Sequence, residues 1–259
     1  TNKTPWEAFW AKEYAFTLGE IYESRAIYAF YKDDLDKAIA EMKKIPLESR
    51  QVYDEQAEKM VSKQLKLSES SLPANPFNGF IQDCHHCEHA KKRTPYTKIS
   101  FLQKVKEMEE KLAKGEDMYN NALLLGNAFY SASYFGNSRA FYYNDILGEA
   151  GGFFVNAQNM TMLLNMTHAK KYYQIAQQHA STDEQRAKIA YMLAKVERNE
   201  FYNKQYYSEG KIYGVSPWEN EIAFKDWQGF KELRKYPHTQ YYKDVIRECG
   251  YFRKVTGNK

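Results

Sequence analysis

The sequence predicts an all-α fold in which antiparallel helical hairpins pack as an irregular array. Three observations favour this class. Glycine and proline, which both disfavour helix interiors, number only 13 and 7 in 259 residues. Ala, Lys, Glu, Leu and Gln recur in long runs, a composition typical of helical proteins. Apolar side chains return at steps of three and four residues along most of the chain, which is the period of a helix with one buried face.

Residues 1–67 are expected to form three N-terminal helices. The first runs from Trp6 to about Tyr31, where the apolar side chains step by three and four residues. Asp33 or Asp34 can cap a second helix, which forms a helical hairpin with the first. The third helix is expected at about 47–67, because the same period continues there.

A segment at 68–97, which we call the Cys/His loop, separates these helices from the rest of the chain. Pro73, Asn75 and Pro76 precede its centre and Pro95 follows it, and these residue types favour turns and end helices. Two of the three cysteines and three of the six histidines fall within six consecutive residues at its centre. If the chain carries out any chemistry, we expect it at this loop.

Residues 98–259 are expected to add further helical hairpins to one continuous domain. Helices are predicted at about 98–115, 118–135, 138–147, 156–180, 183–207, 227–236 and 239–249. Ser181 or Thr182 can cap the helix at 183–207. Gly126 lies on the apolar face of its helix, where glycine costs about 1 kcal/mol of helix propensity relative to alanine. We therefore expect a neighbouring helix to approach closely at that position.

The helix pairs, with small residues at their contacts and aromatic residues one turn away, resemble tetratricopeptide-type repeats. Two stretches carry the resemblance: Leu125, Gly126 and Phe129 followed by Gly136, Asn137, Ala140 and Tyr143, and Leu18, Gly19 and Tyr22 followed by Asp34, Leu35 and Ala38. The repeat period of about 34 residues is not kept, and the Cys/His loop interrupts the array. The resemblance implies an irregular tetratricopeptide-like array with a surface for a protein partner.

A second resemblance rests on longer stretches. Asp83 to Cys87, Gly136 to Tyr143 and Glu248 to Phe252 are together similar to a set of uncharacterised, tetratricopeptide-like proteins of the bacterial envelope. The similarity covers most of the chain from about Asp83 onward. It implies a location in the bacterial cell envelope, either the periplasm or the surface, and it implies no particular activity.

Charge and hydropathy exclude two classes of partner. The formal net charge is +4, from 37 basic and 33 acidic residues that are mixed along the chain. No face is therefore required to be strongly positive, and a nucleic acid is not expected as a partner. No apolar run reaches the roughly 18 residues that a membrane-spanning helix needs, so no membrane span is expected.

The spacing of two cysteines in the Cys/His loop is that of a C-x-x-C pair, which can bind one zinc ion with two thiolates. A structural zinc site needs two more ligands, and thiolate and imidazole ligands suit zinc better than magnesium or calcium. The predicted ligands are Cys84, Cys87 and Cys249, with one histidine from His85, His86 and His89. Such a site would fasten the loop to the C-terminal helix.

Other interpretations of the same residues stay open. Cys84 and Cys87 can form a disulfide or stay as thiols, and Cys249 can be an apolar side chain of the core. Covalent haem attachment is excluded at this pair, because Glu88 stands where that chemistry needs a histidine. The histidines can also lie on the surface of the loop.

Two functional hypotheses follow from these features. The favoured one is a non-enzymatic helical-repeat module that binds a protein partner along a concave surface rich in tyrosine, of which the chain has 22. It would serve as a scaffold in a bacterial envelope assembly. The alternative is a metal-dependent or thiol-dependent enzyme centred on Cys84 and Cys87.

Overall fold

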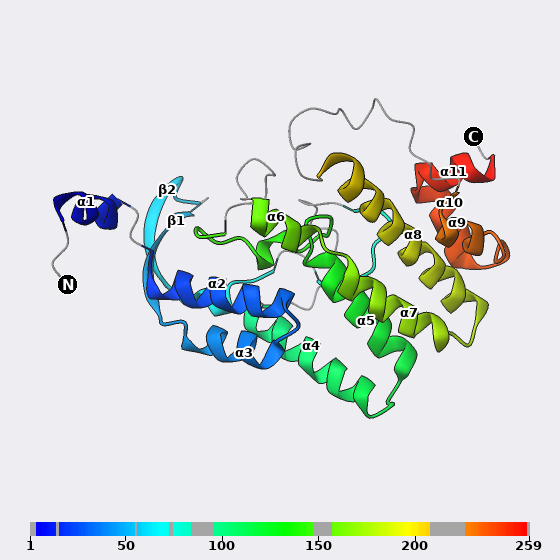
Figure 1. Ribbon diagram of the computed structural model, residues 1–259, viewed down its shortest axis with the longest axis horizontal. Coiled ribbons are helices and arrows are strands. Elements are labelled where there is room, and N and C mark those ends of the chain that lie inside the picture. The colour runs from blue at the N-terminus through cyan, green and yellow to red at the C-terminus, as the bar shows by residue number, and fades with distance from the viewer. Residues whose placement is uncertain are drawn as a thin grey trace.

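The computed structural model describes residues 4–13, 16–54, 56–72, 75–83, 96–147, 157–207 and 226–257 (Figure 1). In chain order its elements are α1 (Pro5–Glu13), α2 (Leu18–Tyr31), α3 (Leu35–Lys44), β1 (Glu48–Asp54), β2 (Lys59–Leu65), η1 (Leu67–Glu69), α4 (Lys98–Ala113), α5 (Met118–Ser131), η2 (Arg139–Phe141), α6 (Ala157–Leu164), α7 (Thr167–Gln178), α8 (Asp183–Tyr206), α9 (Gln228–Leu233), α10 (Gln240–Glu248) and α11 (Gly250–Thr256). The described chain is mostly helical, which confirms the all-α class at this level, and it also contains a two-stranded sheet.

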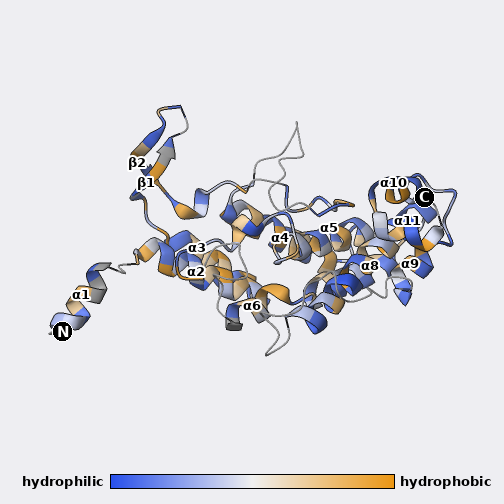
Figure 2. Ribbon diagram, turned by 90° about the horizontal axis from the view of Figure 1, so that it is seen from above, coloured by the Kyte–Doolittle hydropathy of each residue, from blue (hydrophilic) through white to orange (hydrophobic). Residues whose placement is uncertain are grey.

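The first predicted helix is divided in two. Thr17 starts α2 with a capping box, in which its hydroxyl accepts from the Glu20 backbone N–H at 3.2 Å and the Glu20 carboxylate accepts from the Thr17 N–H at 2.8 Å. Because this cap turns the chain out of the helical path, α1 stands away from the helical body in both views (Figures 1 and 2).

The prediction of a helix at about 47–67 is wrong, because this stretch forms a β-hairpin. The strands β1 and β2 pair antiparallel, with Glu48 opposite Leu65 and Val52 opposite Val61. The Asp54 carboxylate accepts from the backbone N–H groups of Gln56 and Ala57, both at 3.1 Å, and so reverses the chain. Turn chemistry and β-branched residues therefore outweigh the helical spacing here.

The hydrophobic core joins α2, α3, α4, α5, α7 and α8. At its N-terminal side the rings of Phe101, Phe129 and Phe141 surround Phe30, with centroid distances between 4.8 and 5.6 Å. Such spacings are typical of aromatic pairs that stabilise a core beyond the area they bury. Tyr142 and Tyr173 are fully buried in the same core.

The close approach predicted at Gly126 is confirmed. A Cβ atom at this position of α5 would lie 2.4 Å from Cδ1 of Tyr173 in α7, and α5 and α7 pack along their length. Gly229 in α9 has the same role against α8, because its Cβ would lie 2.4 Å from the carbonyl oxygen of Ala190. Both glycines set how near two helices can come.

The helix predicted at 138–147 is reduced to the single 3-10 turn η2. Asn144 explains the interruption, since its side-chain oxygen accepts from the Ile146 N–H at 2.9 Å and its amide donates to Glu23 at 2.5 Å. A side chain that bonds nearby backbone and a distant carboxylate competes with helical hydrogen bonding. In the same way the Asn165 side chain accepts from the Thr167 N–H at 2.8 Å, and the predicted helix at 156–180 divides into α6 and α7.

The long helix α8 holds the C-terminal helices through two carboxylates. Thr182 caps α8, which confirms one of the two predicted caps. Glu184 accepts from the backbone N–H groups that start α10, at 3.0 and 2.7 Å. Glu197 accepts from those that start α9, at 3.0 and 2.8 Å. Helix N-termini are positive ends of a dipole, so each carboxylate stabilises the docking of a helix as well as its start.

Candidate functional site

Most of the predicted metal ligands lie outside the described residues. These are Cys84, His85, His86, Cys87 and His89. Cys249 is described: its side chain is buried, and its residue links α10 to α11. Within the described ranges no three or more His, Cys, Asp or Glu side chains are arranged to hold a metal ion.

Asp83, the residue directly before Cys84, is held in a buried network of ions and hydrogen bonds. Its Oδ1 accepts from Lys195 Nζ at 2.6 Å, and its Oδ2 accepts from Arg198 Nη2 at 2.5 Å. The Tyr130 hydroxyl donates to Oδ2 at 2.8 Å. The end of the described segment 75–83 is thus fastened to α5 and α8 by three side chains.

The charges in this network determine the direction in which the pKa values of Asp83 and Lys195 shift. Burial alone would raise the pKa of Asp83, but the adjacent Lys195 and Arg198 outweigh it and lower that pKa. Burial lowers the pKa of Lys195, and the attraction of Asp83 only partly opposes this because Arg198 repels the ammonium group. The Asp83 carboxylate, which is shared by two cations, is therefore held in its ionised form.

Cys249 lies beside the same segment. The Gln82 side-chain amide donates to the backbone carbonyl of Glu248 at 2.7 Å. The Tyr191 hydroxyl donates to the Ile81 carbonyl at 2.7 Å. Burial raises the pKa of Tyr191, and the nearby Cys249 side chain raises it further. Residues 81–83 therefore pass directly over the C-terminal end of α10, where Cys249 is placed.

The sequence of α8 carries one signal for this network. Lys195 and Arg198 are three residues apart in α8, where Lys195 is buried and the Arg198 side chain is 17% exposed. Lysine and arginine are almost never buried unless they are paired. Two cations on the inner side of a predicted helix thus indicate a buried carboxylate, although its position in the sequence cannot be read from them.

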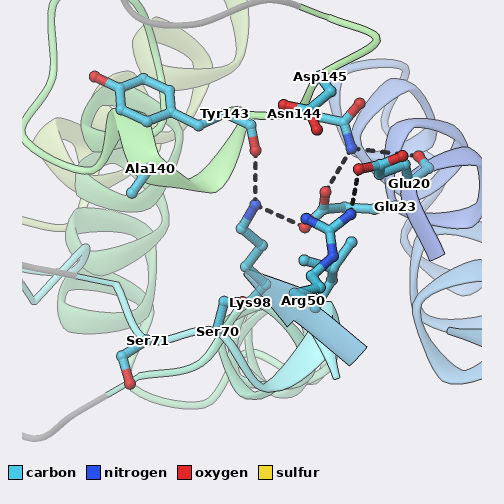
Figure 3. Close-up of a pocket in the computed structure, with 11 residues that line it drawn as sticks. Glu20, Glu23, Arg50, Ser70, Ser71, Lys98, Ala140, Tyr143, Asn144 and Asp145 are labelled. Carbon is cyan, nitrogen blue, oxygen red and sulfur yellow. Dashed lines mark hydrogen bonds and ion pairs between the residues drawn. The ribbon is translucent and has the colours of Figure 1, made fainter. Parts of the chain in front are cut away.

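A polar cavity of about 230 Å³ forms where the hairpin meets the helical body (Figure 3). It collects side chains from four separate parts of the chain. Arg50 comes from β1, Glu20 and Glu23 from α2, Lys98 from the first residue of α4, and Asp145 from the turn after η2. No motif in the sequence indicates this cavity, because its members are far apart along the chain.

The inner wall of the cavity is a buried ion pair. Lys98 Nζ lies 2.8 Å from Glu23 Oε1 and donates to the carbonyl of Tyr143 at 3.0 Å. The other carboxylate oxygen of Glu23 accepts from Asn144. Burial lowers the pKa of Lys98 and the Glu23 carboxylate opposes that shift. Nearer the mouth, Arg50 contacts Glu20 in the arrangement drawn in Figure 3.

The large apolar side chains that are exposed within the described residues all lie in the N-terminal part of the chain. They are Trp6, Phe9, Phe16, Leu18, Leu47 and Met60, between 47% and 66% exposed. They belong to α1, the start of α2, and the stretch from the end of α3 to β2, which occupy one end of the molecule in Figure 2. We call this set the apolar end.

The described tyrosine side chains do not form the exposed binding surface that the sequence predicts. Among the tyrosine side chains that the structure describes, none is fully exposed, and they are either buried or half-buried in helix contacts. A concave surface of exposed tyrosines is therefore absent from the described part of the chain. None of the described helices combines the length and hydropathy needed to cross a lipid bilayer.

No protein-family model, curated protein or solved structure matches the chain.

Proposed function

We propose that the chain is a non-enzymatic protein-binding or scaffold module of a bacterial envelope assembly. The apolar end is the observation that supports protein binding most directly. Figure 2 shows α1 and the hairpin projecting on two sides of this end, and exposed large apolar side chains on such projecting elements are candidates for burial against a partner. The envelope location rests on the resemblance of the Asp83–Cys87, Gly136–Tyr143 and Glu248–Phe252 stretches to envelope proteins.

The arrangement of the apolar end favours a partner that covers it. The rings of Trp6 and Phe9 stack on one another, with centroids 6.1 Å apart, while both side chains stay more than half exposed. Leu47 and Met60 stand on the chain that leads into the hairpin and on the hairpin itself. An isolated two-stranded hairpin is marginally stable in water. A protein surface that buried these side chains would stabilise both the hairpin and α1.

The helical body suits a scaffold. The consecutive pairs α2 and α3, α4 and α5, and α7 and α8 each pack against one another. Stacked helix pairs provide extended surfaces whose stability comes mainly from neighbour contacts. We infer an irregular tetratricopeptide-like array, in which the hairpin and the Cys/His loop are insertions.

A structural zinc site is part of the same proposal. Its ligands would be Cys84, Cys87, one histidine of the Cys/His loop and Cys249. The contact of Gln82 with Glu248 supports this, since it brings the chain beside Cys249 two residues before Cys84. The burial of Cys249 favours a ligand or core side chain over a nucleophile that a substrate must reach.

Comparative affinity capture tests the proposed function. A variant with Phe9→Ser, Leu18→Ser and Met60→Ser removes three exposed apolar side chains. A matched control changes three exposed polar residues of the C-terminal helices, as Lys231→Ser, Arg234→Ser and Lys243→Ser. We expect the same envelope protein to be retained by the native chain and the control and lost by the apolar-end variant. Equal retention by both variants would contradict the proposal.

A further inference from the structure

Helix α1 presents exposed rings on a helix that is too short to be stable by itself. It has nine residues, and isolated helices shorter than about 12–15 residues are marginally stable in water. Trp6 and Phe9 are 66% and 52% exposed. In both views the helix stands away from the helical body (Figures 1 and 2). A further surface that covered these rings would stabilise α1.

The hairpin of β1 and β2 presents a second set of apolar side chains at the same end. Met60 in β2 is 57% exposed, and Leu47, just before β1, is 65% exposed. Because α1 and the hairpin project on two sides of this end, neither covers the other within one chain (Figure 2). Both parts of the apolar end therefore leave area available to another molecule.

The two projecting elements carry opposite charges beside their apolar side chains. Glu7 lies between the two rings of α1 in the sequence. Its Oε2 accepts from the Thr4 N–H at 2.8 Å and from the Thr4 hydroxyl at 2.9 Å, while its Oε1 has no polar contact with any described residue. Lys59 directly precedes Met60 in β2, is exposed, and forms no ion pair with a described residue. An acid beside the rings thus complements a lysine beside the methionine.

A half-turn brings these complementary elements of two copies together. A twofold axis at this end of the molecule, perpendicular to the plane of Figure 2, would carry α1 of a second copy to the side where the hairpin of the first copy stands. The same operation brings α1 of the first copy to the hairpin of the second, so each contact forms twice. Twofold dimers are the commonest oligomers, and they need only one self-complementary surface.

We propose that the partner of the apolar end is a second copy of this chain, with α1 of each copy packed on the hairpin of the other. The rings of Trp6 and Phe9 would cover Met60, because a thioether packs favourably against aromatic rings. Glu7 would form an ion pair with Lys59 at the edge of this contact. The inference rests on the proposed function, since it names the partner of the same surface.

The exposed area is sufficient for such a dimer. The six side chains of the apolar end are each between 47% and 66% exposed. Large aromatic side chains have about 150–250 Å² of surface, so each of the six offers roughly 100 Å². This gives about 600 Å² from each copy and about 1,200 Å² from both, which reaches the lower end of the range for specific interfaces.

Sedimentation equilibrium of the purified full chain tests the inference. We expect the native chain to dimerise reversibly. Glu7→Lys and Lys59→Glu each place like charges at both contacts, so each should weaken dimerisation about tenfold or more. Because each variant supplies the charge that the other lacks, an equimolar mixture of the two should dimerise about as tightly as the native chain. Glu116→Lys, a reversal at an exposed carboxylate outside the apolar end, is the control and should leave dimerisation unchanged.

Recovery on mixing identifies a contact between two copies, because a contact within one chain cannot be restored by another chain. Circular dichroism checks that the variants are folded. Unchanged dimerisation in folded Glu7→Lys and Lys59→Glu, or a mixture that dimerises no more tightly than either variant, would overturn the inference. A native chain that stays monomeric would also overturn it, while the capture experiment would still decide whether a different protein binds the apolar end.

Discussion

The carboxylate of Asp83 lies 2.6 Å from the ammonium group of Lys195 and joins the residue before Cys84 to the middle of α8. The two residues are 112 positions apart in the sequence. Since Arg198 and Tyr130 bind the same carboxylate, these contacts fix Asp83, in the described part of the Cys/His loop, against α5 and α8. The stability of the network is the first property to measure.

Asp83→Asn should strongly destabilise the fold. The variant leaves the buried Lys195 and the half-buried Arg198 without this counter-ion, and removing one partner of a buried ion pair typically costs about 3–5 kcal/mol. Urea unfolding near neutral pH measures this cost. Asp183→Asn, which weakens only the exposed contacts of Asp183 with Arg186 and His238, is the control and should change stability little. Equal losses in the two variants would refute the role of the network.

The stabilisation that Asp83 provides should depend on pH, and the same variant measures this dependence. The pKa of Asp83 is lowered in the folded protein, so its contribution is fully present above the unfolded value of about 3.9 and is lost as pH falls through the folded value. The difference in unfolding free energy between native chain and Asp83→Asn should therefore stay constant from neutral pH down to about pH 5, and shrink below about pH 4. A difference that shrinks near neutral pH contradicts this assignment.

Gly126→Ala should destabilise the contact between α5 and α7. The added methyl group would lie 2.4 Å from Tyr173 Cδ1, and overpacking of this kind costs about 1–3 kcal/mol, more than the roughly 1 kcal/mol gained in helix propensity. Gly250→Ala is the matched control, because its Cβ would meet nothing closer than 3.9 Å. Thermal unfolding should show a lower midpoint for Gly126→Ala alone.

Because Lys98 and Glu23 form a buried ion pair, substitutions of the two residues should have strongly coupled effects on the free energy of unfolding. Lys98→Met leaves the Glu23 carboxylate buried with only Asn144 as a partner, and we expect a loss of about 3–5 kcal/mol. Adding Glu23→Gln removes that uncompensated charge, so the double variant should recover part of the loss. A double-mutant cycle by urea unfolding measures the coupling, and additive effects would contradict a direct ion pair.

If the proposed zinc site forms, the native chain should contain zinc in a measurable amount. Elemental analysis should find about one zinc ion per native chain, and thiol titration should find fewer reactive cysteines until a chelator is added. Cys249→Ser should lower the zinc content. Val245→Ala is the control, since it also removes buried side-chain volume near the end of α10 but no ligand, and it should lower stability while zinc is retained. A native chain without zinc would refute the site.

Local sequence signals identified the helices that carry long periodic patterns and clear caps. The stretch at 98–115 became α4 and that at 183–207 became α8, because apolar period and cap agree in both. The hairpin was missed, since the apolar spacing of its residues also fits a helix and only the Asp54 turn decides between them.

The sites were less accessible from the sequence. Cys249 and the Cys/His loop can be recognised because cysteine is a typical metal ligand, and both its positions and its C-x-x-C spacing are read directly from the sequence. The Asp83 network and the polar cavity depend on side chains that are far apart in the sequence, as the separation of 75 positions between Glu23 and Lys98 illustrates. No helical or strand period encodes such a pairing, so only the packed fold discloses it.

Photo-crosslinking in cells tests the central claim, that the apolar end binds a protein partner, most directly. A photoreactive phenylalanine analogue is placed at Phe9 or at Met60, and at the exposed Lys231 of α9 as a control. We predict that both positions of the apolar end form an adduct with the same protein and that the control position does not. No adduct at Phe9 and Met60, or the same adducts from all three positions, would contradict the account.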